Sequence, residues 1–239
     1  KSYDQVFAAR CGDAAEKSWG WACANPSVVH PENVEGTGPY EDGKDLKYKD
    51  EFFWAATELY LATNKQQYKD SVCTMLSTRK ISASAWWQDV NNLGFFSLAM
   101  NPNSLGDSIN SIVKKEIVNY ADTLVNRINS NGYRVSMVTR DYTWGSTGNA
   151  GNQGVVLVYA HKLTGIRRYL DALVMTNDYL LGKNPVGYSY ITGFGSLSPL
   201  QPHSRPMRAD LIDEPIPGFV VGGANAGDNG GDEYLNEVV

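Results

Sequence analysis

The sequence predicts an all-α fold made of paired helices. Apolar residues recur every three or four positions in several long segments, which is the spacing of an amphipathic helix. Strict alternation of apolar and polar residues, the mark of a half-buried strand, is weak along the whole chain. A short motif also occurs twice, each time between two helical segments, and this pattern predicts repeated helical hairpins.

Seven helices are expected in chain order, followed by the start of an eighth at Asp232. Their ranges are 3–25, 49–64, 66–77, 89–100, 107–132, 148–165 and 167–182. Asn64 is expected to cap the second helix in a left-handed conformation, and Gly132 is expected to end the fifth. The first helix carries an apolar stripe of Phe7, Cys11, Ala14, Ala15, Trp19 and Ala22.

The repeated motif lies at two helix junctions. The pattern Thr-Asn, three residues, Tyr, one residue, Asp begins at Thr63, and its relative with Gly in place of Asn begins at Thr164. Hairpins repeated in this way favour an α/α toroid over a simple bundle. Long polar and aromatic loops, 27–47, 131–147 and 183–231, are expected on one side of the helices, and loops of this length are usually functional.

The composition excludes several classes of function. The formal net charge is −5 and no long basic run occurs, so no nucleic-acid partner is predicted. No stretch of 18 apolar residues occurs, so no membrane span is predicted. The three cysteines, Cys11, Cys23 and Cys73, match neither a disulfide framework nor a zinc motif, and buried thiols are expected. Aromatic residues reach 11%, which suits binding of sugar faces, although most of the rings are expected in the core.

The common nucleotide and hydrolase motifs are absent. The glycine-containing segment GFGSLSP has the spacing of neither a phosphate loop nor a dinucleotide fingerprint. No nucleophile elbow accompanies the three histidines. Candidate chemistry therefore has to come from carboxylates and from polar side chains in the loops.

One candidate is the pair His203 and Arg205 in the loop PLQPHSRPMR. Alternate residues of an extended segment project to the same side, so the pair offers several donors for hydroxyls or a carboxylate. A surface ion-pairing role fits the same spacing.

Glu237 is a second candidate, near the start of the last predicted helix. Asp228 and Asp232 precede it, and neighbouring carboxylates or burial beside Tyr234 would raise its pKa, as a general acid requires. A solvated acidic residue, favoured by the helix dipole, fits the spacing equally well.

Asp50, Glu51 and Asp89 form a third candidate group at the starts of two helices. Carboxylates are common N-caps, which explains their positions without any ligand. Three carboxylates could also bind a hard cation such as calcium.

Seven segments, taken in order, resemble family 9 of the glycoside hydrolases, the inverting cellulases. They are KDEFFWAATELYLATN, WWQDVNNLGFFSLA, DYTWGSTGNAGNQG, NDYLLGKNPVGYSYITGFG, QPHSRP, PGFVVGGAN and DEYLNEVV. The resemblance covers essentially all 239 residues, and its Pro-His-x-Arg and Asn-Glu-Val segments are the most specific.

The resemblance implies an (α/α)6 barrel of twelve helices with an open cleft across one end. In that case Glu237 is the general acid that protonates the glycosidic oxygen, and His203 and Arg205 contact sugar hydroxyls near the cleavage point. Trp144 and Tyr234 match aromatic positions that line the cleft.

The resemblance also implies a structural calcium ion and no cofactor for the chemistry. Asp50, Glu51 and Asp89 match a calcium site that braces two helix starts, with main-chain oxygens at Leu46 and Lys47 assisting in some relatives.

Some positions depart from the family pattern. Leu197 replaces the usual Asn, Lys or Arg, and Tyr234 lies three rather than four residues before the acid. The catalytic base of the family, in an Asp-Ala-Gly-Asp motif, has no match, since Asp13 lies in a helix. Residues 1–239 are therefore expected to be the later portion of one catalytic domain, an incomplete barrel, with the N-terminal helices and the base outside it.

Taken together, these residues predict an endo-β-1,4-glucanase that cleaves cellulose or related β-glucans by an inverting single displacement. Two alternatives stay open: a non-catalytic glucan-binding or scaffold relative, and an α/α-barrel glycosidase for another β-linked sugar. The expected partners are β-1,4-glucan polysaccharides or oligosaccharides, with accessory carbohydrate-binding or scaffold modules outside this chain. Secretion is expected because the family acts on an insoluble substrate.

Overall fold

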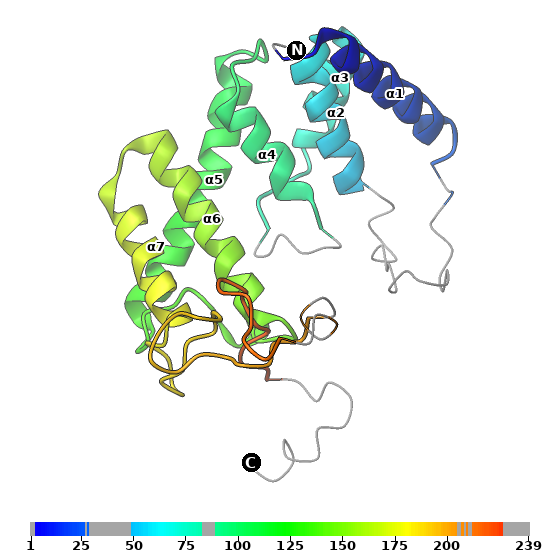
Figure 1. Ribbon diagram of the computed structural model, residues 1–239. Coiled ribbons are helices and arrows are strands. Elements are labelled where there is room, and N and C mark those ends of the chain that lie inside the picture. The colour runs from blue at the N-terminus through cyan, green and yellow to red at the C-terminus, as the bar shows by residue number, and fades with distance from the viewer. Residues whose placement is uncertain are drawn as a thin grey trace. The chain divides into compact units, whose positions relative to one another are not determined.

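Helices dominate the computed structural model, which describes residues 3–26, 28, 49–82, 89–204, 207, 209 and 212–226. This part of the chain contains seven α-helices, one short 3-10 helix and no β-strand, which confirms the all-α prediction (Figure 1). The chain divides into a first unit, residues 1–116, and a second unit, residues 117–239. The boundary falls inside helix α5 (Asp107–Ser130).

The first unit is built around helices α2 (Lys49–Thr63), α3 (Gln66–Leu76) and α4 (Asn91–Met100). Its core consists of fully buried side chains from all three helices, namely Phe53, Ala56, Tyr60, Tyr68, Val72 and Phe95. Helices α2 and α4 approach closely at Gly94, where a Cβ atom would lie 2.4 Å from the Phe53 ring. The absence of a side chain at Gly94 therefore allows the two helices to pack.

Helix α1 (Gln5–Ala24) lies against this core through few contacts. Asp4 caps its start by accepting a hydrogen bond from the Phe7 N–H at 2.8 Å. The Trp19 ring meets Phe52 of α2 edge-on at 5.5 Å. None of the residues of α1 is buried, so the apolar stripe that the sequence predicts is largely exposed to solvent in the part of the chain that the structure describes.

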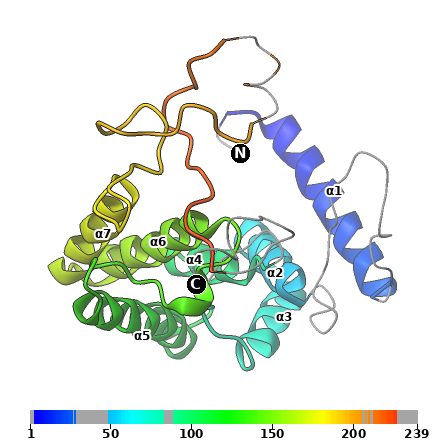
Figure 2. The ribbon, with the colours of Figure 1, turned by 90° about the horizontal axis from the view of Figure 1, so that it is seen from below.

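In the second unit, α6 (Ser146–Thr164) and α7 (Arg167–Leu180) form an antiparallel hairpin, and the two helices lie side by side in both ribbon views (Figures 1 and 2). Fully buried Ile117, Leu124, Ile128, Leu157 and Tyr169 belong to α5, α6 and α7. Gly154, in the middle of α6, would place a Cβ only 3.1 Å from Leu173 of α7. A small residue at this position therefore permits the close contact within the hairpin.

The repeated sequence motif is confirmed as a repeated structure. Asn64 and Gly165 both adopt the left-handed conformation, with φ of 55° and 70°. The preceding threonine in each copy donates to a carbonyl four residues earlier at 2.7 Å. Tyr68 and Tyr169 are both fully buried, and each donates its hydroxyl to a carboxylate on a different helix. The same short motif therefore builds the same junction in both units.

One local prediction is wrong. Helix α5 ends at Ser130, and Gly132 does not adopt the left-handed conformation that was expected to end it. Arg134 takes that conformation instead, with φ of 54°, and its guanidinium donates to the Asn129 carbonyl at 3.1 Å. The left-handed residue is therefore an arginine and not the glycine, and its side chain bonds the end of α5.

Two further expectations concern the surface. Cys11 and Cys23 are exposed and Cys73 is partly buried, and none forms a disulfide, so the prediction of buried thiols is wrong for the two cysteines of α1. Within the described residues, none of the helices combines the length and the apolar character needed to cross a membrane.

Candidate functional site

Two of the residues predicted to contact the substrate are described by the structure, and three are not. Glu237, Tyr234 and Arg205 lie outside the described residues. Trp144 and His203 both belong to the second unit and are exposed. Among the described residues, no hydrogen bond or ring contact joins their side chains. Trp144 exposes 66% of its surface, which is unusual for a tryptophan and is consistent with a binding role.

A sharp turn presents Trp144 at the surface. The turn, residues 138–145, contains the short 3-10 helix Thr139–Asp141. It ends at Gly145, the N-cap of α6, where φ is +78°. Glycine favours this left-handed conformation because it lacks a Cβ atom. Ser146, two residues after Trp144, is already buried, so the exposed ring stands directly beside fixed backbone.

A buried carboxylate, Asp141, holds this turn in place. Its Oδ2 atom accepts hydrogen bonds from the Val138 N–H at 3.1 Å and from the Gln153 amide at 3.0 Å. The Arg127 guanidinium of α5 lies 3.6 Å from the same oxygen. The Gln153 amide is oriented in turn by the Ser136 hydroxyl, which donates to its oxygen at 2.6 Å. The carboxylate thus joins α5, the turn and α6.

A second segment, residues 219–226, crosses the start of α6, and we call it the strap. The Ser146 hydroxyl donates to the Ala224 carbonyl at 2.5 Å, and the Thr147 hydroxyl donates to the Val221 carbonyl. Both hydroxyls belong to the first turn of the helix. The strap is therefore fixed beside Trp144, and residues 227–239, which include Glu237, follow it in the chain.

Two buried tyrosines pack close to Tyr142, which is part of the turn. The rings of Tyr179 and Tyr190 are 5.9 Å apart, and Tyr142 packs against the same buried cluster. Burial raises the pKa of Tyr179 well above its ordinary value, and the neighbouring Tyr142 and Tyr190 raise it further. Burial also raises the pKa of Tyr190. The Tyr179 and Tyr190 phenols are therefore neutral across the physiological pH range, and they form an uncharged support for the turn.

The sequence analysis missed the residues that position this turn. Asp141, Ser146, Thr147 and Gln153 all lie in the segment DYTWGSTGNAGNQG, from which only Trp144 was selected. A signal existed, because five polar residues occur within the first eight positions of a helix whose following residues are mostly apolar. Polar residues on a buried helix face require specific hydrogen-bond partners.

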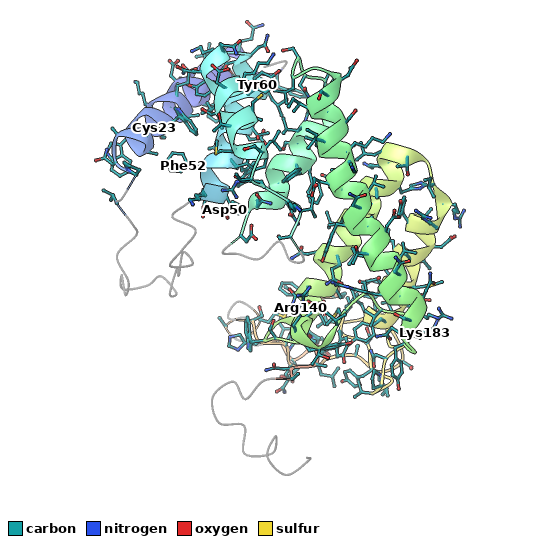
Figure 3. The ribbon with its side chains drawn as sticks, turned by 180° about the vertical axis from the view of Figure 1, so that it is seen from behind. Cys23, Asp50, Phe52, Tyr60, Arg140 and Lys183 are labelled. Carbon is teal, nitrogen blue, oxygen red and sulfur yellow. The ribbon has the colours of Figure 1, made fainter. Side chains whose placement is uncertain are left out.

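The predicted acidic group belongs to the first unit, where Asp50 lies at the start of α2 (Figure 3). Asp50 is almost fully buried, and its Oδ2 atom accepts a hydrogen bond from the Val90 N–H at 2.9 Å. Asp89 accepts a hydrogen bond from the N–H of Asn91, the first residue of α4, at 3.0 Å. Val90 is the N-cap of α4, so Asp89 lies one residue before the cap and accepts the first helical N–H from there, while Asp50 links the starts of α2 and α4.

The same group contains a buried oxygen whose partner is missing. Within the described residues, the Oδ1 atom of Asp50 accepts no hydrogen bond. Burial lowers the pKa of the nearby Arg79, whereas the charges of Asp50, Asp89 and Glu51 oppose that shift. No group of three His, Cys, Asp or Glu side chains converges on one point within the described residues. The unsatisfied Asp50 oxygen fits a hard cation, although the carboxylates are not gathered around one.

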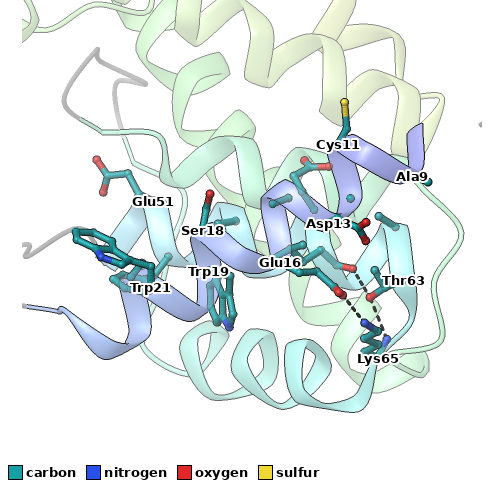
Figure 4. Close-up of a pocket in the computed structure, with 18 of the residues that line it drawn as sticks. Ala9, Cys11, Asp13, Glu16, Ser18, Trp19, Trp21, Glu51, Thr63 and Lys65 are labelled. Atoms are coloured by element: carbon teal, nitrogen blue, oxygen red, sulfur yellow. Dashed lines mark hydrogen bonds and ion pairs between the residues drawn. The ribbon is translucent and has the colours of Figure 1, made fainter. Parts of the chain in front are cut away.

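A separate groove lies between α1 and α2, with a volume of about 1280 Å³. Figure 4 shows the Glu16–Lys65 ion pair, with an N–O distance of 2.5 Å, at one end and Trp21 and Glu51 at the other. Its remaining lining is mostly apolar. Among the predicted site residues that the structure describes, Glu51 alone lines it, and no residue of the Trp144 turn does.

Comparison with known proteins identifies relatives along the whole chain. The family model described as "Glycosyl hydrolase family 9" matches residues 1–238. A xyloglucan-specific endo-β-1,4-glucanase, BoGH9A of Bacteroides ovatus, is 34% identical over 95% of this chain and 40% of that protein. A cellulose 1,4-β-cellobiosidase of Acetivibrio thermocellus is 32% identical over 95% of this chain and 28% of that protein.

Solved structures show the same similarity. The crystal structure of a metagenome-derived glycoside hydrolase family 9 endoglucanase matches with a TM-score of 0.82 and 32% identity, over 94% of this chain and 40% of that one. A structure of Bacteroides ovatus GH9 matches with a TM-score of 0.80 and 33% identity, over 89% of this chain and 40% of that one. The chain therefore spans about two fifths of the length of these relatives.

Proposed function

The chain belongs to glycosyl hydrolase family 9, and from this premise we propose that the protein containing it hydrolyses β-1,4-glucosidic bonds in cellulose or related β-glucans. Family membership across residues 1–238 is the observation that carries this proposal. The related proteins named above act on xyloglucan or cellulose, which supports a β-1,4-glucan as the substrate. We further propose that the protein is secreted, because insoluble glucans are met outside the cell.

In the proposed mechanism Glu237 is the general acid that protonates the departing glycosidic oxygen. Inverting hydrolysis also needs a base that activates water on the opposite face of the sugar, about 6.5–9.5 Å from the acid. We assign that base to a part of the protein outside this chain. The present residues supply the acid and the contacts that orient the sugar.

The sugar contacts are assigned to exposed groups of the loops. The Trp144 ring offers a flat apolar face at the surface, and its backbone is fixed on both sides by buried residues. His203 and Arg205 supply donors for hydroxyls, and Tyr234 supplies a second ring. A prepositioned ring loses little conformational entropy on binding, so it contributes more to affinity than a mobile one.

We also propose a structural calcium ion at the acidic group of the first unit. Asp50, Glu51 and Asp89 would hold it, and the Asp50 Oδ1 atom would gain the partner that the protein does not provide. The ion would supply positive charge that braces the starts of α2 and α4, and it would take no part in bond cleavage.

The decisive experiment is the Glu237→Gln substitution in the longest natural polypeptide that contains this chain. Release of reducing sugar from cellulose should fall by several orders of magnitude, because general acid catalysis contributes about 10²–10⁴-fold and the amide cannot donate its proton. Glu214→Gln changes an exposed glutamate that lies earlier in the chain, in the loop 183–231, and is the matched control. Near-normal turnover by the Glu237 variant would refute the assignment.

A further inference from the structure

We propose that Asp141 is a positioning residue that holds Trp144 in the orientation required to bind a sugar ring. The inference rests on the proposed function, since it concerns how the same site binds its glucan. Asp141 does not touch the substrate. It acts through the backbone of the turn 138–145, which leads directly to Trp144.

Asp141 and Trp144 differ greatly in solvent exposure. Asp141 is 6% exposed and Trp144, three residues later, is 66% exposed. A tryptophan exposed to this degree gains little from burial, so the fold itself does not explain its place. The backbone before it, in contrast, is fixed by a group of buried polar contacts.

The backbone on either side of Tyr142 is held from two directions. The Asp141 carbonyl accepts a hydrogen bond from the Asn149 amide of α6 at 2.7 Å. The Tyr142 carbonyl accepts one from the Ala226 N–H of the strap at 2.8 Å. Both peptide groups lie within three residues of Trp144, so they set the direction from which its side chain leaves the turn.

The hydrogen-bond and ion-pair partners of the Asp141 carboxylate are all donors. Val138 presents a backbone N–H, and Arg127 presents a guanidinium. Gln153 must present its NH2 group, because its oxygen is occupied by the Ser136 hydroxyl. The exposed Arg140 guanidinium lies 3.9 Å from the second oxygen, Oδ1. An asparagine at position 141 would keep one acceptor oxygen for Val138 and Gln153, but it would lose the negative charge that faces Arg127 and Arg140 and so weaken the contacts that hold the turn.

A comparable ion pair elsewhere in the second unit serves as the matched control. Asp122 of α5 accepts hydrogen bonds from Arg168 at 2.5 Å and from Tyr169 at 2.7 Å. Its contacts join α5 to α7, and they involve no residue of the turn 138–145. The Asp122→Asn and Asp141→Asn substitutions remove the same charge, yet only the second acts on the backbone that carries Trp144.

The test measures kcat and KM on a soluble β-1,4-glucan with the longest natural polypeptide that contains this chain. Trp144→Ala should raise KM about tenfold, which corresponds to loss of one buried ring face. Asp141→Asn should raise KM about threefold or more while kcat changes less than about twofold. Asp122→Asn should leave KM unchanged. A merely structural defect would lower the active fraction, and hence kcat, without raising KM.

The double variant Trp144→Ala/Asp141→Asn decides whether the two residues act together. If Asp141 acts through Trp144, the double variant has the KM of Trp144→Ala alone, because interacting positions are non-additive. A full additional rise in KM would overturn the proposal, as would an Asp141→Asn variant whose KM equals that of the wild type.

A second readout separates failure of this inference from failure of the proposed function. Amide hydrogen exchange of residues 138–145 should be faster in Asp141→Asn than in the wild type and unchanged in Asp122→Asn. If the wild type neither cleaves nor binds β-1,4-glucan, the proposed function fails and Trp144 is no sugar platform. Cleavage by the wild type with unchanged exchange in Asp141→Asn would overturn the positioning role alone.

Discussion

Gly223 of the strap lies so close to Thr147 of α6 that no side chain fits between them. A Cβ atom at Gly223 would lie 2.4 Å from Thr147 Cγ2, and the residue has φ of +77°. The Thr147 hydroxyl donates to the Val221 carbonyl, two residues before the glycine. This contact fixes the strap at the start of α6, beside the turn that carries Trp144.

The Gly223→Ala substitution should destabilise the strap by about 2–5 kcal/mol. The left-handed conformation costs a non-glycine residue roughly 1–2 kcal/mol, and overpacking against Thr147 adds about 1–3 kcal/mol. Urea unfolding measures the loss. Gly218→Ala is the control, because Gly218 has φ of +95° but open space around its Cα atom. The double variant Gly223→Ala/Thr147→Ser removes Cγ2 and keeps the hydroxyl, so it should recover part of the stability that Gly223→Ala loses. Equal losses of stability for Gly223→Ala and Gly218→Ala would contradict the steric argument.

The two hairpin junctions predict unequal effects for equivalent substitutions. Tyr169 donates to Asp122 at 2.7 Å, whereas Tyr68 donates to Glu16 at a longer 3.3 Å. Hydrogen bonds to charged groups contribute about 1.5–3 kcal/mol, and long ones contribute less. Tyr169→Phe should therefore lower the urea midpoint more than Tyr68→Phe does. The reverse order would show that the lengths of these two hydrogen bonds do not determine their contributions to stability.

The sequence predicted the helices well because their signals are local. Asn64 and Gly165 end their helices in the left-handed conformation, and the helix before each follows from its apolar spacing. Gly132 failed as a predicted cap: the left-handed residue is Arg134, two positions later, and its side chain bonds the Asn129 carbonyl near the helix end.

The contacts that build the site were not predictable in the same way. Ser146 and Ala224 are 78 residues apart, and their hydrogen bond depends on how the loops cross. Asp141 and Gln153 are only 12 residues apart, but their pairing requires the turn between them to fold back onto α6. Trp144 was selected from a resemblance, whereas the residues that hold it became visible only in three dimensions.

Alkaline pH should destabilise the second unit through its buried tyrosines. Burial raises the pKa of Tyr179 above its ordinary value of 10.0. The unfolded chain therefore releases this proton first, so the stabilisation is complete below pH 10 and is lost as the pH rises beyond it. Thermal unfolding between about pH 8 and 11 should show a falling Tm, with a shallower fall in Tyr179→Phe. An identical slope in the two proteins would exclude Tyr179 as a cause.

Calcium should stabilise the first unit through Asp50. An ion that binds only the folded state adds RT ln(1 + [L]/Kd) to the free energy of unfolding, about 2.7 kcal/mol when the free ion concentration is one hundred times Kd. A chelator should therefore lower the wild-type Tm by several degrees.

The Asp50→Asn substitution should abolish the effect of the chelator. Without the ion, Asp50 is a nearly fully buried carboxylate with one unsatisfied oxygen, and burial of such a charge is costly. An asparagine can still accept the Val90 N–H bond without that charge. The variant should therefore be insensitive to the chelator and at least as stable as the chelated wild type. Asp70→Asn changes an exposed residue of α3, is the control and should keep the wild-type response. A chelator that leaves the wild-type Tm unchanged, together with no heat of calcium binding in calorimetry, would refute the site.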